Sequence, residues 1–314
     1  MNIEQSPKGW SLPRSQFDRT RDGQLLSINR QPRESLRPWV AHVYGMRVTA
    51  PPDQLIACGI FADGPVLRIL LDGDWHAETQ DGPQFFGRQA LYFTPHTRRR
   101  PVSVKGSFAT VGLALQPGAA HALRAPSIAG TCDRVLSYGS LGWDEPALMA
   151  RFGDDASVDS WMDVLEDCME RLIDRAGGRH PDPISANFNR IAFENPNIAV
   201  GTCAEQLRVD LRKLERVVKR DFGLSPKKVL RRARALDMAA NMLGVADQSE
   251  AEDLALRYFD QSHLNRDFTE MFGMTPVQFV RTPQPLMRVT LEARQARRLE
   301  ALERIEEGAR RPWQ

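Results

Sequence analysis

Several features that would place this chain in a class at once are missing. No apolar run approaches the roughly 18 residues that a membrane-spanning helix needs. The chain opens with MNIEQSPKGW rather than with a basic stretch followed by an apolar one, so no targeting segment is indicated. We therefore expect a cytoplasmic protein with no membrane partner.

Cysteine is scarce, and its spacing does not indicate disulfide bonds. The four cysteines lie at positions 58, 132, 168 and 203, and no two of them form a C-x-x-C pair. Thiols this far apart in a chain without a targeting segment are typical of a reducing compartment. We expect all four to be reduced and buried.

The global charge is also uninformative. Formal net charge is +2, from 42 Lys and Arg against 40 Asp and Glu. This balance says nothing about a polyanionic partner, so any such signal has to be local.

What is present indicates an α+β multidomain protein. With 314 residues, 42% of them hydrophobic, the chain is long enough for two domains with a core each. Residues 1–34 are polar and carry little periodicity, which predicts a mobile N-terminal arm. Residues 35–152 contain short alternating or apolar runs such as WVAHVYGMRV and VLRILLDGDWHAE, with DGD at 72–74 and KGS at 105–107 predicted to be hairpin turns. This pattern favours a small antiparallel β barrel or sandwich.

The period then becomes helical. In the segment 157–176 the residues Trp161, Leu165 and Leu172 share one face with other apolar side chains, while acids take the opposite face. RHPDP at 179–183 breaks the chain, so residues 153–183 are interpreted as a connecting helix and linker. The apolar face of this helix could serve a dimer contact or pack within the chain.

The segment 184–282 is predicted to be all-α and holds a local concentration of charge. CAEQLRV at 203–209 predicts a short helix with a turn at Arg208-Val209, and Asp210 then caps a helix whose Leu214 and Val217 face the core. Between residues 206 and 236 there are eleven Lys and Arg against three acids. Such a run can be only a solvated helix face, but its position after a tight helix-to-helix turn favours a DNA surface.

The same segment resembles the DNA-binding region of AraC/XylS transcription regulators. The resemblance is carried by A204-x-x-L207, by FGLSP at 222–226, and by DQSHLNRDFTEMFGMTPVQF, which ends at Phe279. It implies two helix-turn-helix units joined by a long helix, with both second helices aimed at the major groove of double-stranded DNA. It further implies RNA polymerase, a small-molecule effector and a second copy of the chain as candidate partners.

Candidate DNA-binding residues follow from the helix wheel. Arg212 and Arg216 lie one turn apart and could enter a groove together, since Arg can bind guanine O6 and N7 as a fork. Lys213, Lys219 and Arg220 are better suited to phosphates. In the second unit the candidates are Gln261, Ser262, Asn265 and Arg266.

The second unit departs from the family pattern. Leu254-Ala255-Leu256-Arg257 runs directly into Tyr258, as if two residues including the turn Gly were missing. Residues 237–273 hold eight acids against two basic residues, which DNA would repel unless the acids face away. We expect the first unit to supply most of the affinity and the second to add register and specificity. The alternative is that the second unit only packs against the first.

The stretch 111–143 resembles, more weakly, the cupin-like N-terminal domain of some AraC-type regulators, which implies a sensory β barrel. Candidate effector-binding residues on its strands are Arg68, Trp75, His76 and Phe93, and the alternative for each is an ordinary core or surface role. His42, His76, His96 and His121 are single and widely spaced, without the H-x-H that a cupin metal site uses. We expect no metal, no cofactor and no catalytic residues, and residues 283–314 are predicted to form a charged helix over 288–307. A transcription regulator is therefore favoured over two alternatives, an adaptor that retains the fold without binding DNA and a cupin-type enzyme.

Overall fold

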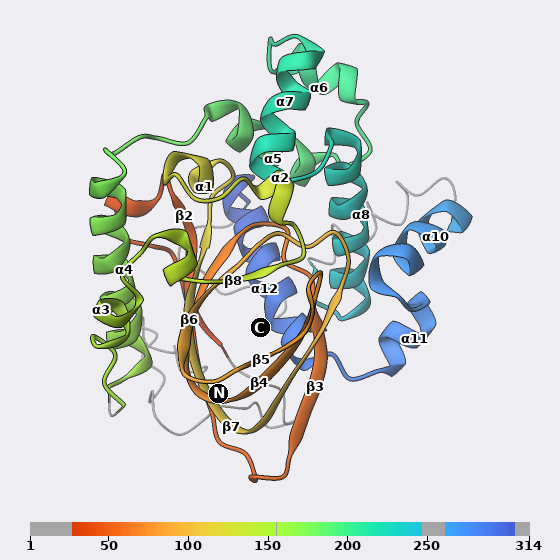
Figure 1. The fold of residues 1–314 in the computed structure, drawn as a ribbon. Helices are drawn as coiled ribbons and strands as arrows, with labels where there is room; N and C mark the ends of the chain where they lie inside the picture. The colour runs from red at the N-terminus through yellow and green to blue at the C-terminus, as the bar shows by residue number, and fades with distance from the viewer. Residues whose placement is uncertain (1–26, 155, 247–260, 305–314) are drawn as a thin grey trace, which may run out of the picture.

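The computed structural model describes residues 27–154, 156–246 and 261–304 (Figure 1). An antiparallel sheet forms the N-terminal part, with strands β1 Ile28–Arg30, β2 Val40–Val48, β3 Leu55–Ile60, β4 Val66–Thr79, β5 Gly82–Phe86, β6 Gln89–Phe93, β7 Arg100–Leu115 and β8 Val135–Ser137. Short helices follow or interrupt it: η1 Glu34–Leu36, α1 Ala119–Ala122, α2 Ile128–Thr131, η2 Gly139–Leu141 and α3 Glu145–Met149. The rest is helical: α4 Val158–Arg175, α5 Pro183–Glu194, α6 Val200–Gln206, α7 Leu211–Phe222, α8 Pro226–Met242, α10 Gln261–Phe272, α11 Pro276–Arg281 and α12 Pro285–Ala301. The predicted combination of a β-rich N-terminal part and a helical C-terminal part is confirmed.

Two long strands, β4 and β7, organise the sheet. The strand order is β1-β2-β7-β4-β6-β8. Outside this order, β3 pairs with residues 100–105 of β7, and β5 pairs with residues 75–79 of β4. The predicted hairpin turns are wrong, because both glycine-containing sites lie inside these strands. Gly73 has φ +103° where the β4 and β7 registers shift, and Gly106 has φ +71° between the segments of β7 that pair with β3 and with β2. A left-handed residue here bends a strand instead of reversing it.

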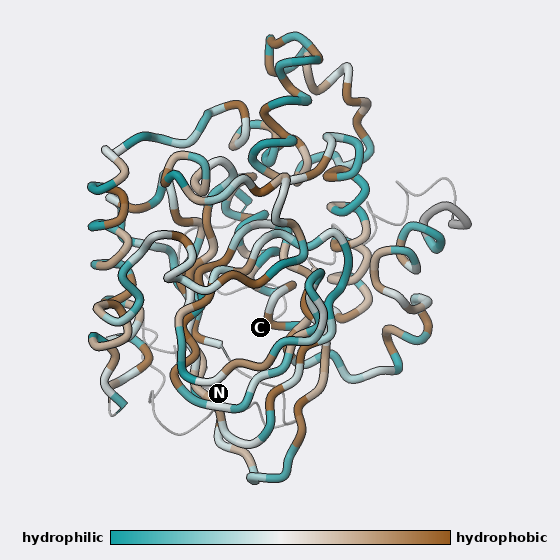
Figure 2. Tube along the Cα trace, in the orientation of Figure 1, coloured by the Kyte–Doolittle hydropathy of each residue, from teal (hydrophilic) through white to brown (hydrophobic). Residues whose placement is uncertain are grey.

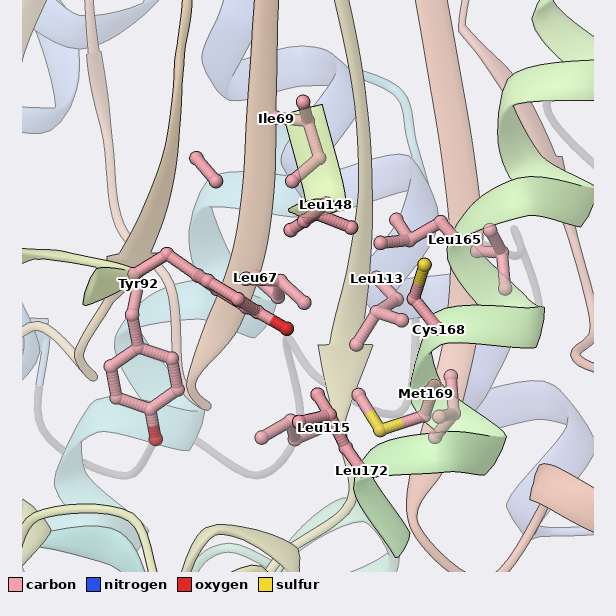
Figure 3. Packing of buried hydrophobic residues seen from close by; sticks show 14 of the residues in the cluster. Leu67, Ile69, Tyr92, Leu113, Leu115, Leu148, Leu165, Cys168, Met169 and Leu172 are labelled. Atoms are coloured by element: carbon pink, nitrogen blue, oxygen red, sulfur yellow. The ribbon is translucent and has the colours of Figure 1, made fainter. Parts of the chain in front are cut away.

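One hydrophobic core lies between the sheet and α4. Leu67, Leu113 and Leu115 from β4 and β7 meet Leu165 and other residues of α4, as Figure 3 shows. The predicted helix over 157–176 is confirmed with its apolar face, which packs within the chain against β2 and β7. Figure 2 shows the alternation of hydrophobic and hydrophilic residues along α4. The four cysteines are free; Cys58, Cys168 and Cys203 are buried, and Cys132 is partly buried.

The predicted mobile arm is too long. Residues 28–30 form β1 on the edge of β2, and Arg30 and Arg33 reach across to α4. Glu166 on α4 is fully buried; it accepts a hydrogen bond from Arg33 N at 2.7 Å and lies 2.6 Å from an Arg30 guanidinium nitrogen. The acidic face of α4 is thus partly covered by these cations.

Besides a core of its own in each of the two parts, the molecule has a second core that the two parts share. Ile60, Phe61 and Val102 of the sheet region pack in one cluster with residues of α8, α10, α11 and α12. A third cluster lies within α5 to α8. Because buried apolar surface joins the sheet to the helices, the two parts are held together by hydrophobic burial as well as by the chain.

The C-terminal helix differs from its prediction. α12 begins at Pro285 and ends at Ala301, not over 288–307, and it buries Met287, Leu291 and Leu299. Residues 305–307 of the predicted helix lie outside the described residues. Within the described residues, no helix is both long and apolar enough to cross a membrane.

Replacing Glu166 by Gln should lower the free energy of unfolding by about 1–3 kcal/mol, because it removes the buried charge that Arg30 and Arg33 share. Urea denaturation followed by tryptophan fluorescence measures this. Asp163→Asn is the matched control, since its side chain is 60% exposed beside the same Arg30, and its effect should stay below about 0.5 kcal/mol. Equal effects of the two substitutions would contradict the assigned role of Glu166.

Candidate nucleic-acid interface and effector pocket

Helices α6 and α7 are joined by a tight turn, as predicted. Arg208 takes the left-handed conformation with φ +52°, and Val209 N donates to Ala204 O at 3.0 Å. The side chain of Asp210 then accepts from Lys213 N at 2.8 Å and caps α7. Gly223, with φ +74°, ends α7 in the left-handed conformation that favours glycine.

The basic residues of α7 fall into two groups. The side chains of Arg212, Lys213 and Arg216 are exposed, and among the described residues none of these side chains makes a hydrogen bond or an ion pair. Lys219 donates from Nζ to Gly223 O at 3.0 Å, closing the C-terminal end of the helix. Arg220 donates to both carboxylate oxygens of Asp221, at 2.6 Å each, and to Asp182.

The prediction of Arg220 as a phosphate-binding residue does not fit this placement. Its guanidinium is committed to Asp221, which is buried, and to the N-cap Asp182 of α5, so it holds α7 against α5. The hydrogen bond to Asp221 raises the pKa of Arg220, which keeps it charged in this role. The helix wheel missed this because Asp182 lies 38 residues away in sequence.

The basic residues of α8 divide in the same way. Arg231 and Arg234 turn towards α10, and Arg232 is buried with hydrogen bonds to His96 O and Asp63 O in the sheet region. Lys227 and Lys228 stay exposed at the start of α8, without a polar partner in the described part of the chain. Together with Arg208 and the three cations of α7, they form a group of six exposed cations that we call the first basic surface: Arg208, Arg212, Lys213, Arg216, Lys227 and Lys228.

The acids next to the second candidate helix are neutralised by α8. Arg231 donates to Asp267 at 2.6 and 3.1 Å and to Glu270 at 2.8 Å. The bond to Asp267 is the largest cause that raises the pKa of Arg231. Repulsion of DNA by these two acids is therefore weaker than the sequence count suggested.

The exposed side of α10 carries Asn265, Arg266 and Thr269, while Phe268 is buried and stacks on Phe272 with ring centroids 4.2 Å apart. The side chains of Gln261 and Ser262 lie outside the described residues, and so does the segment 254–258 where the turn glycine is missing. Of the four candidates in this unit, the structure describes the side chains of Asn265 and Arg266, on one face.

Both candidate recognition helices touch the β region at their C-terminal ends. Phe61 meets Phe272 of α10 edge to face with centroids 5.4 Å apart, and Arg99 N donates to Met271 O at 2.7 Å. At the end of α7, a Cβ on Gly223 would lie 2.3 Å from Cys132 Sγ, so this helix end is in close contact with the segment after α2. Figure 1 shows α6 and α7 extending away from the sheet, with α10 and α11 to one side.

A cavity of about 80 Å³ lies between the sheet and α12. Arg68, Trp75 and Phe93 line it, as three of the four effector candidates, and His76 does not. In a regular strand, residues 68 and 75 would point to opposite faces of the sheet, because one position is even and the other odd. Both face the cavity here because the irregularity at residues 70–74 shifts the alternation of β4. His76 therefore points away, with Nε2 3.4 Å from Glu78.

The polar wall of the cavity belongs to a buried cluster of charges. The carboxylate of Asp63 forms salt bridges with the guanidinium groups of Arg294 and Arg297 of α12, each with an N–O distance of 3.1 Å. Arg294 also forms a salt bridge with Asp237 of α8. Burial would raise the pKa of Asp63, but Arg297, Arg294 and the nearby Arg232 outweigh it and hold the pKa below its ordinary value. Sequence reasoning missed this cluster because its members lie on three separated segments.

Within the described ranges, no three His, Cys, Asp or Glu side chains converge as metal ligands would. His96 is buried in the same region, and burial is the main cause that lowers its pKa to about 4. Its Nδ1 accepts a hydrogen bond from Ala62 N at 3.1 Å, so the ring holds the backbone of the loop between β3 and β4.

Comparison with known proteins gives one family match. Residues 203–282 match the model of a helix-turn-helix domain. Among solved structures, ToxT from Vibrio cholerae is 9% identical over 76% of this chain and 96% of that chain, with a TM-score of 0.44. The C-terminal domain of AraT, a response regulator from Geobacillus stearothermophilus, is 22% identical over 32% of this chain and 85% of its own, with a TM-score of 0.28.

The AraC-like transcriptional activator CuxR is 14% identical over 62% of this chain and 72% of its own, with a TM-score of 0.25. Since the three TM-scores are below 0.5, none of these likenesses alone establishes a shared fold. No curated protein matches the sequence. The family match covers α7, α8, α10 and α11, and it supports a DNA-binding transcription regulator with an AraC-type helix-turn-helix domain in its C-terminal part.

Proposed function

We propose that the protein regulates transcription by binding a specific DNA site chiefly through α7, with α10 adding register and specificity, and that a small molecule bound in the β region modulates it. The observation that carries this proposal is the first basic surface. Its six cations surround the α6–α7 turn and the start of α8, in the region matched to the helix-turn-helix family.

Arg212 and Arg216 are the base-contacting candidates, because they are exposed one helical turn apart on α7 and free to enter a major groove. Lys213, Lys227 and Lys228 are suited to phosphates on either side. On α10, Asn265 and Arg266 present a hydrogen-bonding face whose neighbouring acids are already paired with Arg231. Such a face can form hydrogen bonds with bases, but it adds little electrostatic attraction to DNA.

The spacing of the two units also suits one face of a duplex. The joining helix α8 has 17 residues, which corresponds to about 26 Å. One helical turn of DNA is roughly 34 Å, and the helices that flank α8 extend the reach beyond its length. RNA polymerase contact, a homodimer and an effector in the cavity near Arg68, Trp75 and Phe93 belong to the same proposal.

Replacing Arg216 by Ala should weaken binding to the preferred DNA site by about 1–3 kcal/mol and relax preference at one position. The site is first obtained by selecting duplexes from a random pool with the full-length protein, and affinity is then measured by fluorescence anisotropy over a salt series. Arg175→Ala is the matched control, since it removes one exposed positive charge from α4, outside the DNA-binding domain.

If selection enriches no motif while binding remains steeply salt-dependent, the protein has a basic surface without sequence reading, and the proposal fails. Equal losses for Arg216→Ala and Arg175→Ala would remove α7 from the interface. A complete absence of DNA binding would favour the adaptor.

Replacing Arg231 by Gln should weaken DNA binding roughly three- to tenfold at low salt, because Asp267 and Glu270 would then repel the duplex beside α10. The loss should shrink as salt rises. Arg231→Lys keeps the charge and should retain most of the affinity. If Arg231→Gln lowers thermal stability but leaves DNA affinity unchanged at every salt concentration, α10 does not approach the duplex.

A further inference from the structure

The cavity between the sheet and α12 has a wall that lies outside the matched helix-turn-helix region. Leu286, Val289, Ala293 and Arg297 of α12 close it on one side, opposite Trp75 and other residues of the strands. A helix that follows the DNA-binding domain in sequence thus completes a pocket of the N-terminal domain. Most of the lining is apolar, which suits a ligand with a hydrocarbon body.

Two buried polar atoms of this wall have no hydrogen-bond partner among the described residues. They are His42 Nδ1 and Arg297 Nε. A buried donor left unpaired costs about 1–3 kcal/mol. A ligand in the cavity would supply hydrogen-bond partners for both atoms and so remove this cost.

Both groups line the cavity, and both can donate a hydrogen bond. Burial is the main cause that lowers the pKa of His42 to about 3, and the charge of Arg297 is the next. The imidazole is therefore neutral near pH 7 and carries one N–H, while Arg297 keeps a free Nε–H. A group that accepts two hydrogen bonds at one point, such as a carboxylate, matches this pair.

The surrounding charges also favour an anion. The buried cluster at this wall contains Arg232, Arg294 and Arg297 against Asp63 and Asp237, an excess of one positive charge. A single negative charge added here would balance the cluster in a region of low dielectric constant.

A second cation faces the same cavity. Arg68 donates from Nε to Tyr44 Oη at 2.8 Å and lies over the Phe93 ring at 4.9 Å. In the part of the chain that the structure describes, it pairs with no carboxylate. The carboxylate of Asp63 on the cavity wall is already paired with Arg294 and Arg297, which weakens its repulsion of an anion.

We propose that this cavity binds a small organic monocarboxylate, whose oxygens accept from His42 Nδ1–H and Arg297 Nε–H and whose apolar body lies against Trp75, Phe93 and Leu286. The inference rests on the proposed function only in treating the cavity as the effector site. A cavity of about 80 Å³ corresponds to roughly six water-sized probes, enough for a compact ligand of about nine non-hydrogen atoms after small adjustments of α12.

Isothermal titration calorimetry of the full-length protein tests this with two probes of equal size. Cyclohexanecarboxylate should bind with one site per chain, and the neutral cyclohexanecarboxamide should bind at least about tenfold more weakly. Arg297→Met should reduce carboxylate affinity at least about tenfold. The matched control is Arg281→Met, an exposed arginine on α11, which should leave the affinity unchanged.

Because Arg297 also pairs with Asp63, Arg297→Met could impair folding, so a second variant tests the site separately. Ala293→Leu fills the cavity without touching the charges and should abolish binding of both probes. Equal affinity for acid and amide, unchanged affinity in Ala293→Leu, or no binding of the acid at 10 millimolar would each overturn the proposal. No DNA is present in these titrations, so their failure is distinct from a failure to bind DNA.

Discussion

The carboxylate of Asp63 is the point on which the arrangement of the whole molecule depends. It belongs to the loop between β3 and β4, yet its two oxygens are held by Arg294 and Arg297 of α12, and Arg294 continues to Asp237 of α8. Asp237 is fully buried, so without Arg294 its carboxylate would be an uncompensated buried charge. The sheet, α8 and α12 are therefore stable in this arrangement only together, which fixes the DNA-binding domain against the β region.

This constraint changes how a signal could pass from the β region to DNA. The linker at 179–183 is short, but it is not the main connection, because Phe61 packs on Phe272 at the end of α10 and the end of α7 touches Cys132. Each candidate recognition helix thus has its own direct contact with the β region. A change in the shape of that region reaches both helices through side-chain packing, and so acts on their relative orientation.

Local features of the chain were predictable, and partners distant in sequence were not. The cap at Asp210, the glycine stop at Gly223 and the amphipathic α4 follow from residues within one or two turns. The turn glycines at 73 and 106 were misassigned, since a left-handed residue can reverse a strand or bend it, and only the pairing of β4 with β7 decides which. For the same reason strand patterning could predict three residues that line the cavity, Arg68, Trp75 and Phe93, while the lining residue Arg297 could not be predicted.

The charge pattern shows why a count along the sequence misleads. The basic run at 206–236 and the acidic segment after it look like one surface that attracts DNA and one that repels it. In the fold, Arg231 and Arg234 neutralise Asp267, Arg220 is held by Asp221 and Asp182, and Arg232 is buried. The cations that remain exposed in this run gather around α7 and the start of α8. Because long-range attraction depends on unpaired charge, we expect a duplex to be drawn first to α7 and to meet α10 afterwards, at the short range where hydrogen bonds form.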